Sequence, residues 1–323
     1  MGLAELKVQD TSKESAIFQN IVVAVDFSPA SRRALAAALA LADANHGHLT
    51  VVHVLRSDWR YEVASVRQAD LELIDAEQQL KAWISELRSD RLASDNKIES
   101  KLVKHGPVAP AILCNAAELG ADLLVVGTHG RGGLSKFVIG SVSEELLRRA
   151  TFPVMTVGPK AEMLMPTPTQ ERHAILFATD FGPGSKRALP LVVKLTKAQN
   201  AKLILLHMLP LMPSASANLS AYAPASAAAD EFGQWSSSMR ARAVQQLREY
   251  LPPEAGLGYE PEYLVGTDFL PGGMLAVAAK FKVDLIVMGA NAKASAKVAA
   301  HVPWTAVHEV LVQAPCPVLT FAG

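Results

Sequence analysis

The residues of this chain best suited to chemistry are glycines spaced between an apolar run and a helix-like pattern. In VVGTHGRGGLSKFVIGSV, residues 125–142, two residues separate Gly127 from Gly130, and nine separate Gly130 from Gly140. Glycine lets a backbone approach a ligand closely. The free amide groups at the start of the following helix would favour an anion. The stretch predicts a phosphate site, with a tight loop ahead of a capped helix as the alternative.

Other residues of this glycine loop, residues 127–141, fit a phosphate. Ser141 is predicted to cap the helix, and Arg131 and Lys136 add positive charge. Known phosphate motifs do not match: no glycine is followed by Lys and then Ser or Thr, and GxGxxG is absent. Gly132 and Gly133 are expected only to keep the loop flexible.

A second candidate, Asp26, follows the apolar run that opens the chain's first strand-like segment. Ligands of open parallel sheets bind at the carboxyl ends of strands, where the winding direction reverses. If the strand order is 3-2-1-4-5, Asp26 and Gly127 end neighbouring strands and face one crevice. The alternative is that Asp26 only supports the turn into the first helix.

The chain contains two copies of one unit. VAVDFSPASRRAL (23–35) returns as FATDFGPGSKRAL (177–189), and LTVVHVL (49–55) returns as LILLHML (203–209) at the same offset of 154. ADLLVVG returns as VDLIVMG, and ATFPVMTVG as APCPVLTFAG, in unchanged order. We therefore predict a first repeat (1–158) and a second repeat (172–323), joined by a Pro/Thr-rich linker (159–171).

Apolar β-rich runs alternate with helical patterns, which is typical of an α/β fold with a parallel sheet. The expected strands of the first repeat are 20–26, 49–55, 100–104, 122–127 and 153–157, and the expected helices are 28–45, 71–90, 108–120 and 141–150. Ser28 is the predicted N-cap of the first helix and Pro29 its first residue. An Ala/Ser/Pro-rich stretch, 210–230, is expected to be a mobile surface loop.

Composition limits the function classes. The 31 basic and 31 acidic residues balance, so nucleic acid is not expected as a partner. No signal peptide or apolar run of membrane-spanning length is found, and two cysteines, Cys114 and Cys316, suit packing in a reducing cytoplasm. No metal-ligand spacing, paired carboxylates or Ser/His/Asp constellation appears. We expect a cytoplasmic protein with no membrane or metal site and no identifiable catalytic residue.

The glycine loop resembles the G-x2-G-x9-G-[ST] ATP-binding motif of the universal stress protein family, and VAVDFSPASRRAL and VVHVL resemble that family's first strand and helix and its second strand. The resemblance covers nearly the whole chain as two tandem domains. It implies two doubly wound, five-stranded parallel-sheet domains of the adenine nucleotide alpha hydrolase-like type. It also implies ATP, alone or with Mg, as cofactor, and at most slow hydrolysis.

By position, the resemblance puts the adenine and ribose contacts on Ala24, Asp26 and Val54. The ribose and phosphate contacts fall on Val126, Gly127, Gly130, Gly140, Ser141 and Val142. His129 and Arg131 complete the candidate ATP-binding set, although we expect His129 to stabilise the loop and not to catalyse. His53 recurs as His207, so a structural histidine at a strand end is expected there.

The second repeat has lost most of the loop. It keeps Asp180 and Gly289, but Ala292 aligns with Gly130, and Trp304-Thr305 with Gly140-Ser141. We predict that this repeat does not bind ATP in the family manner. It is expected to be a structural partner, or else to hold a different, more apolar ligand.

The final strands, PVMTVG and PVLTFAG, are apolar and are expected at sheet edges, where exposed strands pair. In the family such strands form dimer contacts, so the repeats are expected to pair as a pseudo-dimer, with whole chains forming a homo-oligomer. The function expected is a nucleotide-gated stress-response regulator. Two alternatives stay open. One is an ATP-independent structural or chaperone-like protein, and the other is an adenylylating enzyme, which DFSPAS disfavours because it is not a Gly/Ser-rich pyrophosphate loop.

Overall fold

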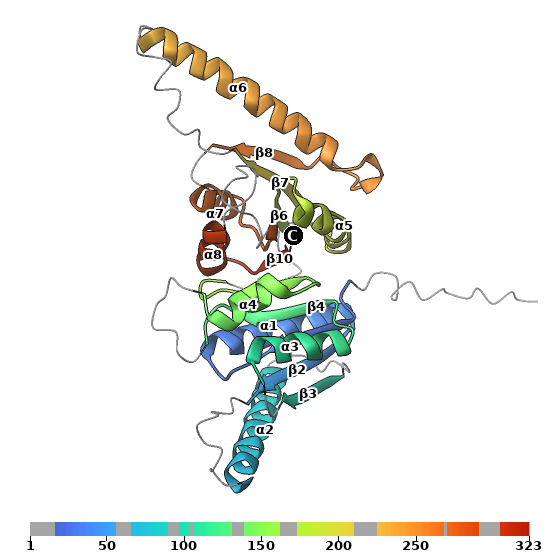
Figure 1. The fold of residues 1–323 in the computed structure, drawn as a ribbon. Coiled ribbons are helices and arrows are strands. Elements are labelled where there is room, and N and C mark those ends of the chain that lie inside the picture. Colours follow the sequence, from blue (N-terminus) through green and yellow to red (C-terminus); the bar gives the residue numbers. More distant parts are fainter. Residues whose placement is uncertain are drawn as a thin grey trace, which may run out of the picture.

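The protein is an α/β structure in which helices cover both faces of one mostly parallel sheet (Figure 1). The computed structural model describes residues 17–55, 66–89, 97–103, 106–130, 139–161, 173–209, 225–267, 270–290 and 304–322. The predicted fold class, two tandem doubly wound domains with five parallel strands each, is confirmed.

The first repeat alternates strands and helices as its sequence predicts. Its elements are β1 (Asn20–Ala24), α1 (Pro29–Asn45), β2 (His48–Val54), α2 (Val66–Ser89), β3 (Ile98–Val103), α3 (Val108–Glu118), β4 (Leu123–Gly127), α4 (Ser141–Arg149) and β5 (Val154–Val157). Ser28 caps α1 with its side chain and Pro29 is the first helical residue, as predicted.

The second repeat has the same order of elements. They are β6 (Ala174–Ala178), α5 (Pro183–Ala198), β7 (Lys202–Met208), α6 (Ala225–Tyr250), a 3-10 turn η3 (Pro253–Ala255), β8 (Glu262–Gly266), α7 (Leu270–Lys280), β9 (Leu285–Ala290), α8 (Trp304–Gln313) and β10 (Val318–Ala322). The loop expected over 210–230 is wrong for residues 225–230, which begin α6. Alanine, which recurs there, is the strongest helix former. The rest of that stretch lies outside the described residues.

The strand order within each repeat is the predicted one. The sheet runs β3-β2-β1-β4-β5-β10-β9-β6-β7-β8, so β1 and β4 are neighbours. They run parallel, with Val23 opposite Val125. The carboxyl ends of these two strands therefore lie side by side at the point where the winding reverses.

The two repeats join through their last strands. β5 and β10 pair antiparallel, with Met155 opposite Leu319. This confirms the pseudo-dimer expected within one chain. In the described sheet the outermost strands are β3 and β8, so β5 and β10 are internal strands and not the exposed edges that were expected. An oligomer of whole chains through these two strands would have to break the pairing between the repeats.

Two apolar layers run continuously through both repeats. One face of the sheet packs on α3, α4, α7 and α8, and the other on α1, α2, α5 and α6. Figure 1 shows α4 and α8 facing one another across the middle of the molecule, with α2 and α6 at its opposite ends. Among the described helices, none combines the length and apolar character needed to cross a membrane.

Candidate nucleotide-binding site

Asp26 lies in the turn that follows β1 and leads into α1. Its Oδ1 accepts a hydrogen bond from the Ser28 amide at 3.1 Å. The intervening Phe27 has a φ of 62°, a left-handed conformation that is uncommon for a bulky residue. The structural role expected as the alternative for Asp26 is therefore present.

The other carboxylate oxygen of Asp26 faces the glycine loop. A β-carbon added to Gly130 would lie 2.6 Å from Asp26 Oδ2, closer than real β-carbons approach a neighbour. Gly130 itself is exposed. Two residues that are 104 positions apart in the sequence thus lie close together next to the carboxyl ends of β1 and β4.

Gly140 lies beside Gly130 and begins α4. Its amide donates to the Thr128 carbonyl at 2.7 Å, and a β-carbon on it would lie 3.6 Å from the Gly130 nitrogen. The expectation that Ser141 caps the helix is wrong, because Gly140 is the N-cap and Ser141 is the first helical residue. Since glycine has no side chain, the first amide groups of α4 receive no cap from it. Such amide groups are suited to an anion.

Gly127 has a different reason to be glycine. A β-carbon on it would lie 2.8 Å from the carbonyl carbon of Ala30 and 3.0 Å from its β-carbon. Helix α1 therefore packs directly on the backbone of β4. The Gly127 carbonyl also accepts a hydrogen bond from Ser143 Oγ on α4 at 2.7 Å. Packing alone accounts for this glycine.

Three histidines make structural contacts, His53 and His129 in the first repeat and His207 in the second. His53 is buried, and its Nδ1 donates to the Val25 carbonyl at 2.7 Å, because a carbonyl can only accept. His207 contacts the Thr179 carbonyl in the same way at 2.8 Å. His129 Nδ1 contacts Thr128 Oγ1 at 2.8 Å, the loop-stabilising contact that was expected. The buried Nε2 of His129 has no hydrogen-bond partner among the described residues.

The remaining candidate residues among those described lie in β1, β2, β4 and α4. Val54 ends β2 and Val126 lies in β4, and both side chains are buried in the core. Ala24 and Val142 are partly buried against the same core face. Ser141 is exposed. Arg131 and Lys136 lie outside the described residues.

The second repeat keeps the turn after its first strand, but the side-chain hydrogen bonds within that turn differ from those of the first repeat. Asp180 Oδ1 accepts from the Gly182 amide at 2.8 Å and from Ser185 Oγ at 2.7 Å. A β-carbon on Gly289 would lie 2.5 Å from the Ser185 nitrogen. Gly289 is thus a packing glycine like Gly127, which explains why both repeats keep it.

The helix that follows the lost loop aligns with α4 through its last turn. The Ala150 amide bonds to the Leu146 carbonyl, and the Ala314 amide bonds to the Val310 carbonyl in the same way. Trp304 is therefore the residue of the second repeat that corresponds to Gly140, as the sequence predicts. Ala292, the counterpart of Gly130, lies outside the described residues.

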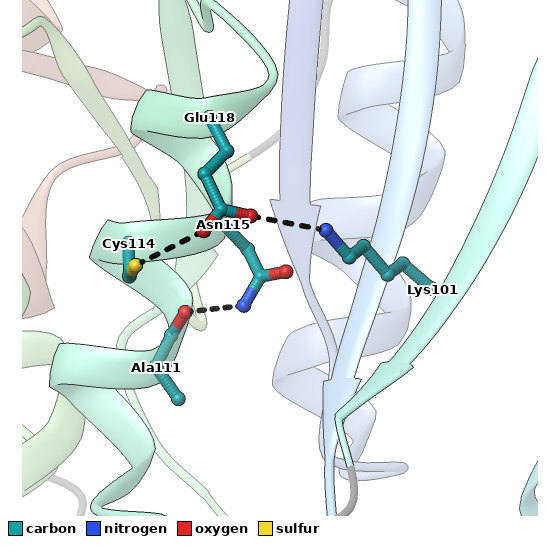
Figure 2. A network of polar contacts seen from close by, with 5 residues as sticks. All are labelled: Lys101, Ala111, Cys114, Asn115 and Glu118. Atoms are coloured by element: carbon teal, nitrogen blue, oxygen red, sulfur yellow. Dashed lines mark hydrogen bonds and ion pairs between the residues drawn. The ribbon is translucent and has the colours of Figure 1, made fainter.

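The two cysteines differ from one another. Cys316 is buried, as predicted, and burial raises the pKa of its thiol to about 12. The expectation that Cys114 is buried packing is wrong, because it is exposed on α3. Figure 2 shows Glu118 between the Cys114 thiol and Lys101. The hydrogen bond to the Glu118 carboxylate raises the pKa of the Cys114 thiol.

A cavity of about 240 Å³ lies away from these residues. It is lined by Asn20, His48 and Lys97, which lie at the amino ends of β1, β2 and β3, together with Ile21, Val22, Leu49, Thr50, Glu99 and Leu119. Because parallel strands share one direction, this cavity is at the opposite end of the sheet from Asp26. It is not the predicted site.

Sequence reasoning missed two serines that connect the site. Ser28 Oγ donates to the His129 carbonyl at 3.2 Å, and Ser143 Oγ donates to the Gly127 carbonyl at 2.7 Å. Ser28 was identified only as a helix cap. Its partner is 101 residues away, and no local pattern in the sequence signals such a pair.

Comparison with known proteins agrees with this architecture. The sequence model described as the Universal stress protein family matches residues 17–158 and again residues 171–321. A Staphylococcus haemolyticus protein described as a universal stress protein is 32% identical over 142 residues, which are 43% of this chain and 84% of that protein.

Two solved structures share the fold over nearly the full length. A universal stress protein from Archaeoglobus fulgidus has a TM-score of 0.61 at 16% identity and covers 94% of this chain and 98% of its own. A Pseudomonas aeruginosa protein of unknown function has a TM-score of 0.57 at 17% identity, with coverages of 94% and 92%. With two successive family matches that together span most of its length, the chain belongs to the universal stress protein family.

Proposed function

We propose that the first repeat binds ATP in the crevice between Asp26 and the glycine loop. In this proposal the adenine and ribose lie against Ala24, Asp26 and Val54. The phosphates lie against the backbone of Gly130 and against the start of α4 at Gly140, Ser141 and Val142. Val126, Gly127, His129 and Arg131 complete the surroundings, and Mg accompanies the phosphates if a metal is used.

The observation that carries the proposal is that the fold does not require glycine at position 140. Its φ is −65°, which any residue adopts. A β-carbon there would make only ordinary contacts, the nearest being 3.5 Å from the Thr128 carbonyl. A ligand that approaches the backbone explains the missing side chain. The second repeat has tryptophan at the aligned position, and a side chain of that bulk is expected to oppose such an approach.

The second repeat acts in this proposal mainly as a structural partner. Its last strand completes the sheet against β5, and its α8 lies opposite α4, the helix that begins at the loop. A separate, more apolar ligand in the second repeat is the alternative.

We further propose that nucleotide occupancy gates a stress-response interaction in the cytoplasm. The sparse cysteines support that location. No described residue is assigned a catalytic role, so the site holds a nucleotide and at most hydrolyses it slowly. A homo-oligomer of whole chains is also proposed, with β3 and β8 as the outer strands of the described sheet that remain for pairing.

The test is ATP titration by calorimetry with and without Mg, using wild type, Gly140→Trp and Gly140→Ala. Gly140→Trp should weaken ATP binding by at least about 30-fold, because several phosphate contacts are lost at once. Gly140→Ala should weaken it less, since only one methyl group enters the crevice. Trp304→Gly is the matched change in the second repeat, and it should leave ATP affinity unchanged.

Melting temperatures of all four proteins separate loss of binding from loss of fold. Wild-type ATP affinity in a folded Gly140→Trp protein would refute the site. Absence of ATP binding in wild type would favour the ATP-independent interaction protein.

A further inference from the structure

The hydroxyl group of Ser28 lies at the junction of helix α1 and the glycine loop. Ser28 is 4% exposed. Its Oγ accepts from the Ser31 amide at 3.2 Å as the α1 cap, and it can donate a single proton. The acceptors within reach are the His129 carbonyl at 3.2 Å and Ser31 Oγ at 3.4 Å.

The hydrogen bonds of Ser31 decide where that proton goes. Ser31 Oγ donates its own proton to the Ser28 carbonyl at 3.0 Å. It accepts from the Asp26 amide at 3.3 Å and from the Ser28 amide at 3.1 Å, whose proton is shared with Asp26 Oδ1. A hydroxyl group has two acceptor positions, so Ser31 Oγ has none left. The Ser28 proton is therefore directed to the His129 carbonyl.

This bond fixes a peptide group of the glycine loop. The His129 carbonyl and the Gly130 N–H belong to the same planar, trans peptide unit and point in opposite directions. Holding the carbonyl toward α1 therefore orients the Gly130 N–H away from α1. Gly130 lies beside Gly140, where the proposed phosphates would bind.

The second repeat lacks this arrangement. Its counterpart of Ser28 is Gly182, the N-cap of α5, which makes no side-chain cap bond. The hydroxyl of Ser185, the counterpart of Ser31, donates instead to Asp180 Oδ1 at 2.7 Å. The repeat that has lost the glycines of the loop has thus also lost the serine that reaches toward it.

We propose that Ser28 is a positioning residue for the nucleotide site of the first repeat. Through the His129 carbonyl it sets the orientation of the Gly130 amide, and it does not touch the ligand itself. This inference rests on the proposed function, because the Gly130 amide matters for binding only if phosphates occupy the crevice.

The sharpest variant is Ser28→Gly, which copies the second repeat. Glycine caps a helix almost as well as serine, so the melting temperature should change by no more than about 2 °C. The donor to His129 is lost, and ATP affinity should fall about 2- to 10-fold, the range of one net hydrogen bond. Ser28→Thr keeps the hydroxyl and should restore affinity to within about 2-fold of wild type.

Gly182→Ser is the matched control in the second repeat and should leave ATP affinity unchanged. A second readout needs no ligand: hydrogen exchange of a peptide spanning 127–142, which includes the Gly140 amide bonded to Thr128. Ser28→Gly should accelerate exchange there, and Ser28→Thr should not.

The outcomes separate the two proposals. Wild-type ATP affinity in Ser28→Gly, or no recovery in a folded Ser28→Thr, overturns the role of Ser28 while the ATP site stands. If wild type binds no ATP, the proposed function fails. Faster exchange in Ser28→Gly would then still support the Ser28–His129 bond, and unchanged exchange would overturn it.

Discussion

Gly127 and Ala30 are in such close contact that a β-carbon on Gly127 would lie 2.8 Å from the Ala30 carbonyl carbon. In the second repeat a β-carbon on Gly289 would lie 2.9 Å from the carbonyl carbon of Gly184, the counterpart of Ala30, and 2.5 Å from the Ser185 nitrogen. In both repeats the first helix packs on the backbone of the fourth strand. The glycine at or next to the end of this strand is therefore required by the fold, and a ligand is not needed to explain it.

Alanine at either position should destabilise the protein. Gly127→Ala and Gly289→Ala each force helix and strand apart, and we expect a loss of about 1–3 kcal/mol in the free energy of unfolding. Gly272→Ala is the control, because nothing lies within 4 Å of a β-carbon added there. Urea denaturation measures all three. A neutral Gly127→Ala together with a costly Gly289→Ala would contradict equivalent packing in the two repeats.

The fold could be predicted from the sequence because the patterns that indicate its strands and helices are local, and because they occur twice in the chain. Buried strands are short apolar runs, and each of them recurs in the second repeat in unchanged order. The pairing of β5 with β10 was expected from their apolar character together with the resemblance to a family in which such strands form dimer contacts. The N-cap of α4 was misplaced by one residue, because serine has the better capping side chain, but Ser141 lies inside the helix and Gly140 is the N-cap.

The site was harder to predict because glycine has several uses. Gly127, Gly130 and Gly140 look equivalent in the sequence, although only the first of these glycines packs against α1. The position of Asp26 beside Gly127, at the start of the glycine loop, followed from the strand order. The hydrogen bond from Ser28 to His129 did not, because it depends on the relative positions of two turns that are far apart in the chain.

Substitution of Asp26 tests whether this residue binds the ligand or only stabilises the turn. Asn at this position keeps an oxygen that can accept from the Ser28 amide, so Asp26→Asn should change stability by less than about 0.5 kcal/mol. If the carboxylate binds a ribose hydroxyl, its loss should weaken ATP binding about 10-fold or more, as for a charged hydrogen bond. Asp180→Asn is the matched control in the second repeat. Equal ATP affinity in wild type and Asp26→Asn would limit Asp26 to the turn.

His53 and His207 should prove structural. Each donates through Nδ1 to a carbonyl at the end of the neighbouring strand and contacts a phenylalanine ring, Phe27 or Phe181. Replacing either histidine by Ala leaves a buried carbonyl without its hydrogen-bond donor. We expect this to lower the free energy of unfolding by about 1–3 kcal/mol. Chemical denaturation of both variants measures this. A large loss of ATP affinity in His53→Ala without loss of stability would instead indicate a ligand contact.

His308 on α8 connects the two repeats and should make their stability depend on pH. Its Nε2 lies 3.8 Å from Glu144 Oε1 on α4, and Glu144 also pairs with Arg148 at 2.9 Å. Burial lowers the pKa of His308, Glu144 opposes that shift, and Arg148 adds to it. The folded state therefore binds the His308 proton more weakly than the unfolded state does.

The sign follows from proton linkage. As the pH falls through the ordinary histidine pKa of about 6.5, the unfolded chain takes up the proton first, so stability is lost. The loss is at most about 1.4 kcal/mol per pH unit for one proton, and it stops below the folded-state pKa. His308→Gln should make the free energy of unfolding less steep between about pH 7 and 5. Glu144→Gln should extend the loss to lower pH, because the opposing carboxylate is gone. Denaturation at a series of pH values measures both, and identical pH profiles for wild type and His308→Gln would contradict this role of His308.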